Sequence, residues 1–282
     1  MININGSLIQ SDKASLEITN RGYTYGDALF ETIRVNAGKI IFWEDHYFRL
    51  MASMRILRMQ IPLKFTPEFL ENEILEVIKE NDLFNTAARV KLIVNRGYGG
   101  LYTPTSNAID YVISASPLDL GFYSISNEPY EVTLFKDHYV AADLLSTLKS
   151  NNKLVNILGG IFAKENGFDN CLLMNSNKMI IEALNGNLFL VKDDVIKTPP
   201  VADGCLKGVL RTQLLRILNE LPDYKVEETS ISPFELQKAD ELFITNVIQG
   251  IQPIYKYRKK EYVTIVSKRL LGIVNTKIRL GS

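Results

Sequence analysis

The sequence predicts an α+β fold in two domains, and three observations lead to this prediction. Strand-like and helical apolar patterns both occur in the first third of the chain. In the second half, short apolar strands follow one another with turn pairs such as Asn-Gly and Asp-Asp between them, which is typical of hairpins. Ser116-Pro117 interrupts the pattern, so we expect a small N-terminal domain over residues 1–115, a linker over residues 116–124 and a larger C-terminal domain over residues 125–282.

The N-terminal domain is expected to contain short strands and two helices. Strands should flank the Asn5-Gly6 turn, and a helix should begin near Asp45. Thr66 and Pro67 favour the N-cap and the first position of a second helix, whose apolar stripe would be Leu70, Ile74, Val77 and Ile78. The remaining expected elements are strands near residues 32–35, 40–43, 89–95 and 109–115, with a glycine-rich loop at residues 96–100.

The C-terminal domain is expected to begin with a helix and to continue mainly as a meander of strands. Its expected elements, in chain order, are a helix over residues 149–165, strands over residues 171–174, 179–183 and 188–191, a helix over residues 209–219, a short helix from Ser232, a strand over residues 241–245 and a closing helix over residues 262–278.

The composition favours a globular protein with a small ligand. The chain has 282 residues with 46% hydrophobic content, which suffices for a substantial core. Lys plus Arg and Asp plus Glu both number 32, so no net charge draws the chain to nucleic acid or to an anionic membrane. The N-terminus has no signal-like pattern and no apolar segment has spanning length, so a cytoplasmic location is expected. Cys171 and Cys205 have no CxxC motif or nearby histidine, so we expect two interior residues and neither a disulfide nor a metal site.

An ordered series of motifs indicates one kind of chemistry. The series comprises, in chain order, residues 21–32 (Arg-Gly-Tyr-Thr-Tyr-Gly-Asp-Ala-Leu-Phe-Glu-Thr), His46-x-x-Arg49-Leu50, Leu148-Lys149-Ser150-Asn151-Asn152-Lys153, Glu182-Ala183-Leu184-Asn185-Gly186-Asn187, Gly208-Val209-Leu210-Arg211 and Thr245-Asn246. This series resembles the class-IV (fold type IV) aminotransferase family over nearly the whole chain. The resemblance implies pyridoxal 5'-phosphate as the cofactor, and a small N-terminal α/β sandwich with a larger barrel-like C-terminal domain.

Lys149 is the Schiff-base lysine that the resemblance implies. Once substrate displaces it, its free amine can act as the base and acid that moves the α-proton. Its pKa, ordinarily about 10.4, must be lowered for this role, and burial beside a cationic cofactor would lower it. Glu182 follows the apolar pair Ile180-Ile181, and in the family this glutamate pairs with the protonated pyridine nitrogen of the cofactor. Taken singly, either residue would be an ordinary surface residue, and the spacing of the whole series argues against that interpretation.

The phosphate site is expected at the start of the helix that follows Gly208. The glycine leaves unpaired amide groups at the helix terminus, which attract a phosphate together with the helix dipole. The resemblance assigns the cofactor phosphate to the amides of Val209 and Leu210, to Thr245 and to Arg49. Asn187 matches the family's cofactor-binding asparagine, although the Asn185-Gly186 pair before it could equally be a hairpin turn, and His46 is expected to have a structural hydrogen bond.

The expected substrate-binding residues distinguish the branches of the family. Phe30 stands where D-amino-acid aminotransferases have a tyrosine, and the loop after Asn95 lacks their histidine. Lys153 lies in the region where branched-chain aminotransferases usually have a tyrosine. This basic residue and the loop Arg96-Gly-Tyr-Gly-Gly resemble aminodeoxychorismate lyases, although the arginine that often follows this loop is absent. We therefore expect conversion of 4-amino-4-deoxychorismate to p-aminobenzoate and pyruvate, with Arg34, Arg96 or Lys153 binding the anionic substrate.

Two alternative functions stay open. The first is an amino-acid aminotransferase of the branched-chain or D-amino-acid type that uses 2-oxoglutarate, and it shares the first half-reaction with the lyase. The second is a cofactor-binding protein without turnover, and the presence of both Lys149 and Glu182 argues against it. Members of the family are dimers, so we expect a homodimer in which the loop of residues 96–102 approaches the cofactor of the neighbouring subunit.

Overall fold

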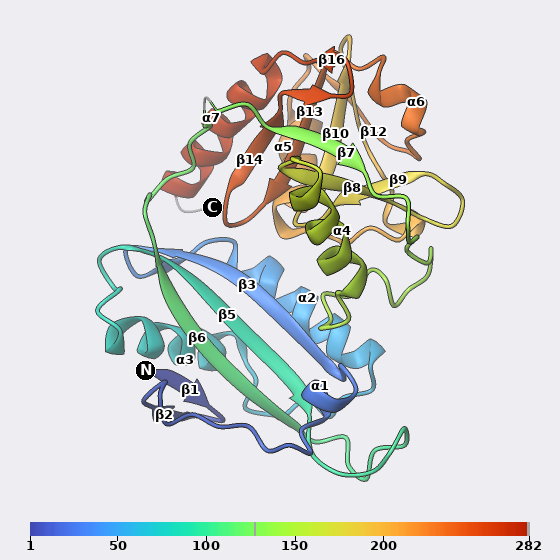
Figure 1. Ribbon diagram of the computed structural model, residues 1–282. Coiled ribbons are helices and arrows are strands. Elements are labelled where there is room, and N and C mark those ends of the chain that lie inside the picture. Colours follow the sequence, from blue (N-terminus) through green and yellow to red (C-terminus); the bar gives the residue numbers. More distant parts are fainter. Residues whose placement is uncertain (127, 281–282) are drawn as a thin grey trace. The chain divides into compact units, whose positions relative to one another are not determined.

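The computed structural model describes residues 1–126 and 128–280, and the chain divides into two compact units (Figure 1). Unit 1 contains residues 1–121 together with residues 149–152, and unit 2 contains the rest of the chain. The α+β class that the sequence predicts is confirmed, because the described residues form helices and three mostly antiparallel sheets.

The boundary between the units differs from the predicted one in two ways. Strand β6 (Ile109–Leu118) takes up the first three residues of the expected linker, and the boundary comes after Gly121. The chain then leaves unit 2 after Leu148 and re-enters it at Lys153. The sequence does not predict this excursion, which brings Lys149 into unit 1.

Unit 1 is built on one antiparallel sheet with the strand order β2-β1-β6-β5-β3-β4. Helices α2 and α3 both lie behind this sheet in Figure 1. Besides β6, its elements are β1 (Ile2–Ile4), β2 (Ser7–Ile9), α1 (Arg21–Thr24), β3 (Ala28–Asn36), β4 (Lys39–Ile40), α2 (Trp43–Ile56), α3 (Pro67–Glu80) and β5 (Ala87–Arg96).

Helix α3 begins as the sequence predicts. The Phe69 N–H donates to Thr66 Oγ1 at 3.2 Å, and Pro67 is the first helical residue. The predicted apolar stripe is buried in full: Leu70, Ile74, Val77 and Ile78. Helix α2 starts at Trp43, two residues before the predicted position, and it buries Leu50 and Met54.

Alternation along the strands gives the sheet of unit 1 two different faces. Leu29, Ile33 and Val35 of β3 are buried, and they share the face that α2 and α3 cover. The opposite face carries Phe30, Thr32 and Arg34 from β3, and Ile93 and Lys91 from β5, because Phe30 pairs with Ile93 and Thr32 with Lys91.

Unit 2 contains two five-stranded sheets that contribute to one hydrophobic core. Their strand orders are β12-β11-β10-β13-β14 and β16-β15-β7-β8-β9, and Leu172, Leu188 and Leu242 from both sheets belong to the same buried cluster. The elements are β7 (Glu131–Leu134), α4 (Leu154–Glu165), β8 (Asn170–Met174), β9 (Ile180–Ala183), β10 (Asn187–Lys192), β11 (Val195–Thr198), the 3-10 turn η1 (Val201–Asp203), α5 (Val209–Glu220), β12 (Lys225–Glu228), α6 (Pro233–Leu236), β13 (Glu241–Asn246), β14 (Gly250–Ile254), β15 (Lys256–Tyr257), β16 (Lys260–Glu261) and α7 (Ile265–Leu280).

The largest difference from the predicted elements concerns the helix expected from Lys149. Helix α4 starts at Leu154, with Lys153 as its N-cap residue. Ser150, just before it, instead forms a β-bridge with Leu29 of β3, because backbone hydrogen bonds to an open strand edge outweigh a local helical preference. Within residues 1–126 and 128–280, no helix is long and apolar enough to cross a membrane.

Candidate functional site

Lys149 lies on unit 1, beside the first residues of β3. The Phe30 N–H donates to the Lys149 carbonyl at 2.8 Å, and the Asn151 N–H donates to the Ala28 carbonyl at 3.0 Å. The Lys149 side chain is half-buried, and its Nζ lies 4.5 Å from the centroid of the Phe30 ring. Backbone pairing with β3 therefore fixes the lysine, and its amine lies against an aromatic ring.

A buried ion-pair network orients Arg49. Glu31 of β3 accepts hydrogen bonds from Arg49 Nε at 2.8 Å and from Arg49 Nη2 at 2.5 Å, and its Oε2 lies 2.7 Å from His46 Nδ1. Burial alone would raise the pKa of Glu31, but the Arg49 charge and the hydrogen bonds from both partners outweigh it and lower that pKa to about 2. Glu31 therefore stays ionised and holds the guanidinium in one orientation.

His46 supports this network as a buried neutral side chain. Burial lowers the pKa of His46 below its usual value, and the nearby Glu31 carboxylate only partly opposes this effect. Among the described residues, Nε2 of His46 has no hydrogen-bond partner. The role of Glu31 is not evident from the sequence, because a single acidic residue in a strand looks like a surface residue. The His46-x-x-Arg49 spacing on the following helix is the one signal that indicates a shared buried partner.

On unit 2, helix α5 has no side-chain cap at its N-terminus. Its N-cap Gly208 provides no side-chain cap, and a Cβ on this glycine would collide with the amide oxygen of Asn187. Val209 and Leu210, the first two helical residues, are buried. An uncapped helix terminus presents amide N–H groups and the positive end of the helix dipole, and both favour an anion.

Leu206 is held from two sides just before this helix. Nδ2 of Asn187 donates to the Leu206 carbonyl at 2.7 Å, and the Leu206 N–H donates to Glu182 Oε2 at 3.0 Å. Asn187 thus ties β10 to the turn that leads into α5, and Glu182 lies at the same turn. The structure gives Asn187 this supporting contact, and its contact with the cofactor stays a prediction.

Thr245 lies directly opposite Asn187 in the sheet and has an unsatisfied hydroxyl. Its Oγ1 is buried and has no hydrogen-bond partner within the part of the chain that the structure describes. A buried polar group without a partner costs roughly 1–3 kcal/mol, so this hydroxyl indicates a partner from outside the chain. A phosphate oxygen can accept from it, and the residues at this turn therefore fit a phosphate-bearing cofactor.

Both cysteines are interior residues, as the sequence predicts. Burial raises the pKa of the Cys171 thiol to about 11. Burial and the nearby Glu182 charge raise the pKa of the Cys205 thiol to about 12. Both are free thiols and stay protonated at neutral pH.

The predicted substrate-binding residues are distributed over the two units. Phe30 and Arg34 share one face of β3. Arg34 is largely buried, and its Nη2 donates to the Leu120 carbonyl. Lys153 belongs to unit 2, where it is half-buried at the N-cap position of α4.

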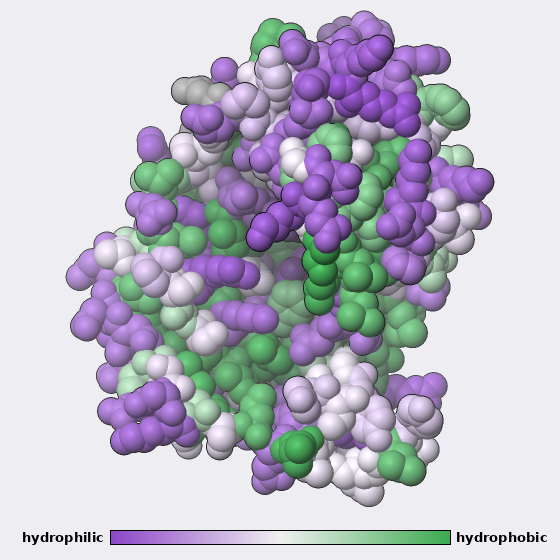
Figure 2. All heavy atoms as spheres, in the orientation of Figure 1, coloured by the Kyte–Doolittle hydropathy of each residue, from purple (hydrophilic) through white to green (hydrophobic). Residues whose placement is uncertain are grey.

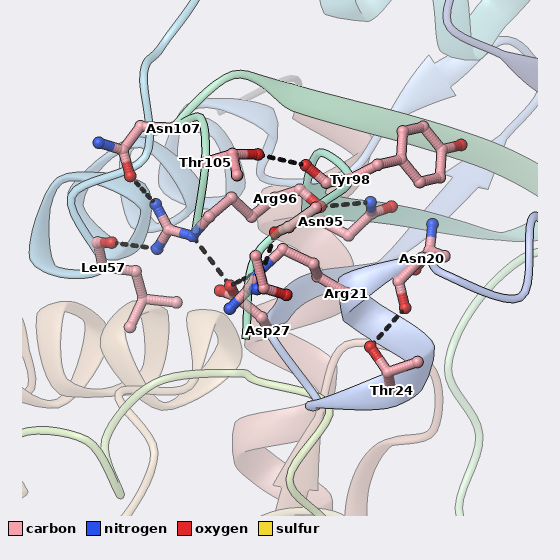
Figure 3. A network of polar contacts seen from close by, with 12 residues as sticks. Asn20, Arg21, Thr24, Asp27, Leu57, Asn95, Arg96, Tyr98, Thr105 and Asn107 are labelled. Atoms are coloured by element: carbon pink, nitrogen blue, oxygen red, sulfur yellow. Dashed lines mark hydrogen bonds and ion pairs between the residues drawn. The ribbon is translucent and has the colours of Figure 1, made fainter. Parts of the chain in front are cut away.

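Arg96 is an internal structural residue, which argues against its predicted contact with substrate (Figure 3). Its Nε donates to Asp27 Oδ2 at 2.9 Å, its Nη2 to the Leu57 carbonyl at 2.6 Å, and its Nη1 to Asn107 Oδ1 at 2.5 Å and to the Arg58 carbonyl at 3.3 Å. The reason is strand alternation: Arg96 lies an odd number of residues from Ile93 and so points to the covered face.

The same network holds the glycine-rich loop. Nε of Arg21 donates to Asp27 at 3.0 Å, and its Nη1 donates to the carbonyls of Gly99 at 3.1 Å and Leu101 at 2.6 Å. Asp27 therefore lies between two buried arginines (Figure 3). The loop backbone is anchored while Leu101 and Tyr102 stay exposed.

Comparison with known proteins identifies the family. A family model described as amino-transferase class IV matches residues 28–257, which include all of the predicted cofactor-binding residues. The chain therefore belongs to this family. It is 29% identical to the "Putative branched-chain-amino-acid aminotransferase" of Methanocaldococcus jannaschii, over 99% of this chain and 93% of the relative.

Solved structures agree with this assignment. The "Putative 4-amino-4-deoxychorismate lyase" of Legionella pneumophila is 26% identical, with a TM-score of 0.83 over 94% of this chain and 96% of that one. A "T.th." branched-chain amino acid aminotransferase, complexed with N-(5'-phosphopyridoxyl)-L-glutamate, is 25% identical, with a TM-score of 0.85 over 97% of this chain and 92% of that one. The protein is thus an enzyme of the class IV aminotransferase family, and pyridoxal phosphate is its cofactor.

Proposed function

We propose that this enzyme is a 4-amino-4-deoxychorismate lyase, which releases p-aminobenzoate and pyruvate. The observation that carries the proposal is the composition of the sheet face beside Lys149. On that face, β3 and β5 place Phe30, Arg34, Arg89 and Lys91, and neither strand adds a carboxylate to it. A flat ring next to several cations suits a ring substrate that carries carboxylate groups.

Residues of both units have proposed roles toward the cofactor. When bound, pyridoxal phosphate supplies the electron sink that stabilises a carbanion at the substrate carbon next to nitrogen. The Lys149 amine would hold the cofactor covalently, and once free it would be the base that takes the proton from that carbon. Glu182 holds a proton on the pyridine nitrogen. On unit 2, the amides of Val209 and Leu210 and the hydroxyl of Thr245 would bind the phosphate. On unit 1, Arg49, which Glu31 orients, is the cation that the resemblance assigns to the phosphate.

Similarity to the Legionella protein supports the lyase proposal, whereas similarity to branched-chain aminotransferases supports a second candidate. In that second candidate, Lys149 would serve as an acid as well as a base, and the product would be an oxo acid instead of p-aminobenzoate and pyruvate. Without Arg96 as a candidate, the proposed anion-binding residues from the sequence are Arg34 and Lys153. Either cation can serve a dicarboxylate such as glutamate as well as the ring substrate.

We also propose that the enzyme acts as a homodimer. Large hydrophobic side chains are exposed on the anchored loop, where Leu101 is 77% and Tyr102 is 91% exposed. Figure 2 shows hydrophobic surface where α4 lies, and this helix exposes Leu154, Ile157, Leu158 and Ile161. Exposed apolar residues gathered in this way favour a protein partner, and a second copy of the chain is the partner that the family implies.

The test is a product assay with the purified holoenzyme. Incubation with 4-amino-4-deoxychorismate should yield p-aminobenzoate and pyruvate in equal amounts. In parallel, L- and D-amino acids are offered with 2-oxoglutarate. Fast turnover of an ordinary amino acid, with no p-aminobenzoate from the ring substrate, would refute the lyase proposal and favour the aminotransferase.

A further inference from the structure

Unit 2 has a cavity whose described walls share no residue with the predicted cofactor and substrate sites. Its volume is about 470 Å³, which lies within the range of small-molecule sites. All of the described residues that line it belong to unit 2. They come from the end of β7 and the segment after it, the turn between β8 and β9, the start of α6 and the turn between β15 and β16. The cavity is therefore a separate candidate site.

The walls of this cavity carry only one sign of charge. Lys136, Lys178 and Arg258 line it, and no carboxylate lies among the described lining residues. This is a local excess, since Lys plus Arg and Asp plus Glu both number 32 in the chain as a whole. The acidic residue of α6, Glu235, does not line the cavity, and its carboxylate pairs with Lys197 at 3.0 Å. Like charges around one cavity repel one another, and a bound anion would relieve this repulsion.

Aromatic side chains form a further part of the wall. Tyr257 is 1% exposed, and Cζ of Arg258 lies 5.3 Å from the centroid of its ring. The Tyr257 hydroxyl is buried and has no hydrogen-bond partner among the residues that the structure describes, so this wall contains unmet hydrogen-bonding capacity. Tyr139 and Phe234 also line the cavity, and both are exposed. Exposed aromatic rings beside cations suit a flat ligand ring that carries negative charge.

We propose that this cavity is a second binding site, and that its ligand is a flat organic ring with two or more negative charges. The anionic groups bind to Lys136, Lys178 and Arg258, and the ring packs against the exposed aromatic side chains. Carboxylates and phosphates share this chemistry, since lysine and arginine bind both. The inference goes beyond the proposed function and does not depend on it, because no residue of this cavity has a role in the reaction at Lys149.

Calorimetric titration of the holoenzyme tests the proposal with two ring probes, benzene-1,3,5-tricarboxylate and adenosine 5'-diphosphate. At least one of them should bind, and the tighter one identifies the anionic group as carboxylate or phosphate. The double variant Lys178→Gly with Arg258→Gly should weaken this binding roughly tenfold or more. Absence of binding by both ring probes at millimolar concentration, or equal affinity in the wild type and the double variant, would overturn the proposal.

Glycine is chosen because it should preserve the fold. The backbone φ is 62° at Lys178 and 57° at Arg258, in the left-handed region that favours glycine, so the thermal unfolding temperature should not fall. The matched control is Arg58→Gly, which removes another exposed cation with a φ of 56° that does not line the cavity. This control should leave the probe affinity unchanged. If the double variant does not fold, glutamine replaces glycine at both positions and the same loss of affinity is expected.

Two further probes separate the ring from the charge. Inorganic phosphate has the charge without the ring, and benzoate has the ring with a single charge, so both should bind at least tenfold more weakly than the better ring probe. Phe234→Ala should weaken the ring probe roughly fivefold through lost stacking and leave inorganic phosphate unchanged. If inorganic phosphate binds as tightly as the ring probes, or Phe234→Ala leaves the ring probe unaffected, the proposed ligand class is refuted.

Discussion

At the residue scale, Glu31 and His46 make the stability of the fold depend on pH. The pKa of Glu31 in the folded protein is about 2, below the roughly 4.3 of an unfolded glutamate. Between these values the unfolded chain binds more protons, so Glu31 contributes its full stability above about pH 4.3 and loses it as the pH falls toward 2. The lowered pKa of His46 acts in the same direction, with the loss beginning below about pH 6.5.

Glu31→Gln should therefore flatten this pH dependence. Denaturant unfolding of both proteins at pH 7, 5 and 3 measures the free energy of unfolding. We expect the variant to lose about 3 kcal/mol at pH 7, because the buried ion pair between Glu31 and Arg49 is broken. Between pH 5 and pH 3, the free energy of unfolding should fall less in the variant than in the wild type. If the free energy of unfolding falls equally in both proteins between pH 5 and pH 3, the folded protein does not keep Glu31 ionised.

Thr245→Val tests whether the buried Thr245 hydroxyl binds the cofactor. Since Oγ1 has no partner among the described residues, valine should leave the stability of the cofactor-free protein unchanged or slightly increase it. The affinity for pyridoxal phosphate should fall roughly tenfold, the equivalent of one lost hydrogen bond to a charged group. Thermal unfolding and cofactor titration measure the two effects. A destabilised cofactor-free protein with normal cofactor affinity would give Thr245 a structural role instead.

At the scale of elements, the N-terminus of α5 has a steric requirement for glycine. A Cβ at Gly208 would meet the Asn187 amide oxygen, and Asn187 also holds the Leu206 carbonyl. Gly208→Ala should therefore displace the turn before α5 and weaken cofactor binding by tenfold or more. Equilibrium dialysis of the cofactor measures the change.

The matched control is Gly272→Ala in the middle of α7. A Cβ there meets nothing within 4 Å, so alanine should stabilise the helix by about 0.5–1 kcal/mol through lower backbone entropy of the unfolded chain. Cofactor affinity should stay the same. Equal cofactor affinity in the two variants would mean that the turn before α5 tolerates displacement.

Local signals explain which elements the sequence predicts well. Helix α3 has a cap, a proline and an apolar stripe that all agree, so its start and its buried face follow from neighbouring residues. Lys149 has no such signal, because its backbone pairing depends on an edge of β3 that lies far away in sequence. The buried contacts of Arg96 could not be predicted for a related reason: its face depends on where β5 ends, and the glycine-rich loop that follows obscures that point.

At the scale of the whole molecule, family membership and cofactor can be predicted from motif order, because each motif is contiguous in sequence. The roles of buried side chains that act on one another cannot be predicted from motif order. Glu31 becomes informative only once β3 and α2 bring its partners together. Glu31 lies within a recognised motif, yet its partners His46 and Arg49 come from a different element.

The proposed homodimer makes a prediction for mixed subunits. Lys149→Ala lacks the cofactor lysine, and Tyr102→Ala alters the exposed loop of residues 96–102. If each loop serves the neighbouring site, each variant alone should have low activity, and subunit exchange should restore roughly a quarter of the wild-type sites. The assay is p-aminobenzoate formation after mixing and exchange. If the mixture is only as active as the average of the two separate variants, the shared site is refuted.

The most direct test of the central claim is to locate the lysine that carries the cofactor. Borohydride treatment of the holoenzyme fixes the cofactor covalently to that lysine, and peptide mass spectrometry then identifies it. Our account predicts bleaching of the visible absorption and a single modified peptide that contains Lys149. Modification of Lys91, Lys153 or any other lysine in its place would contradict it.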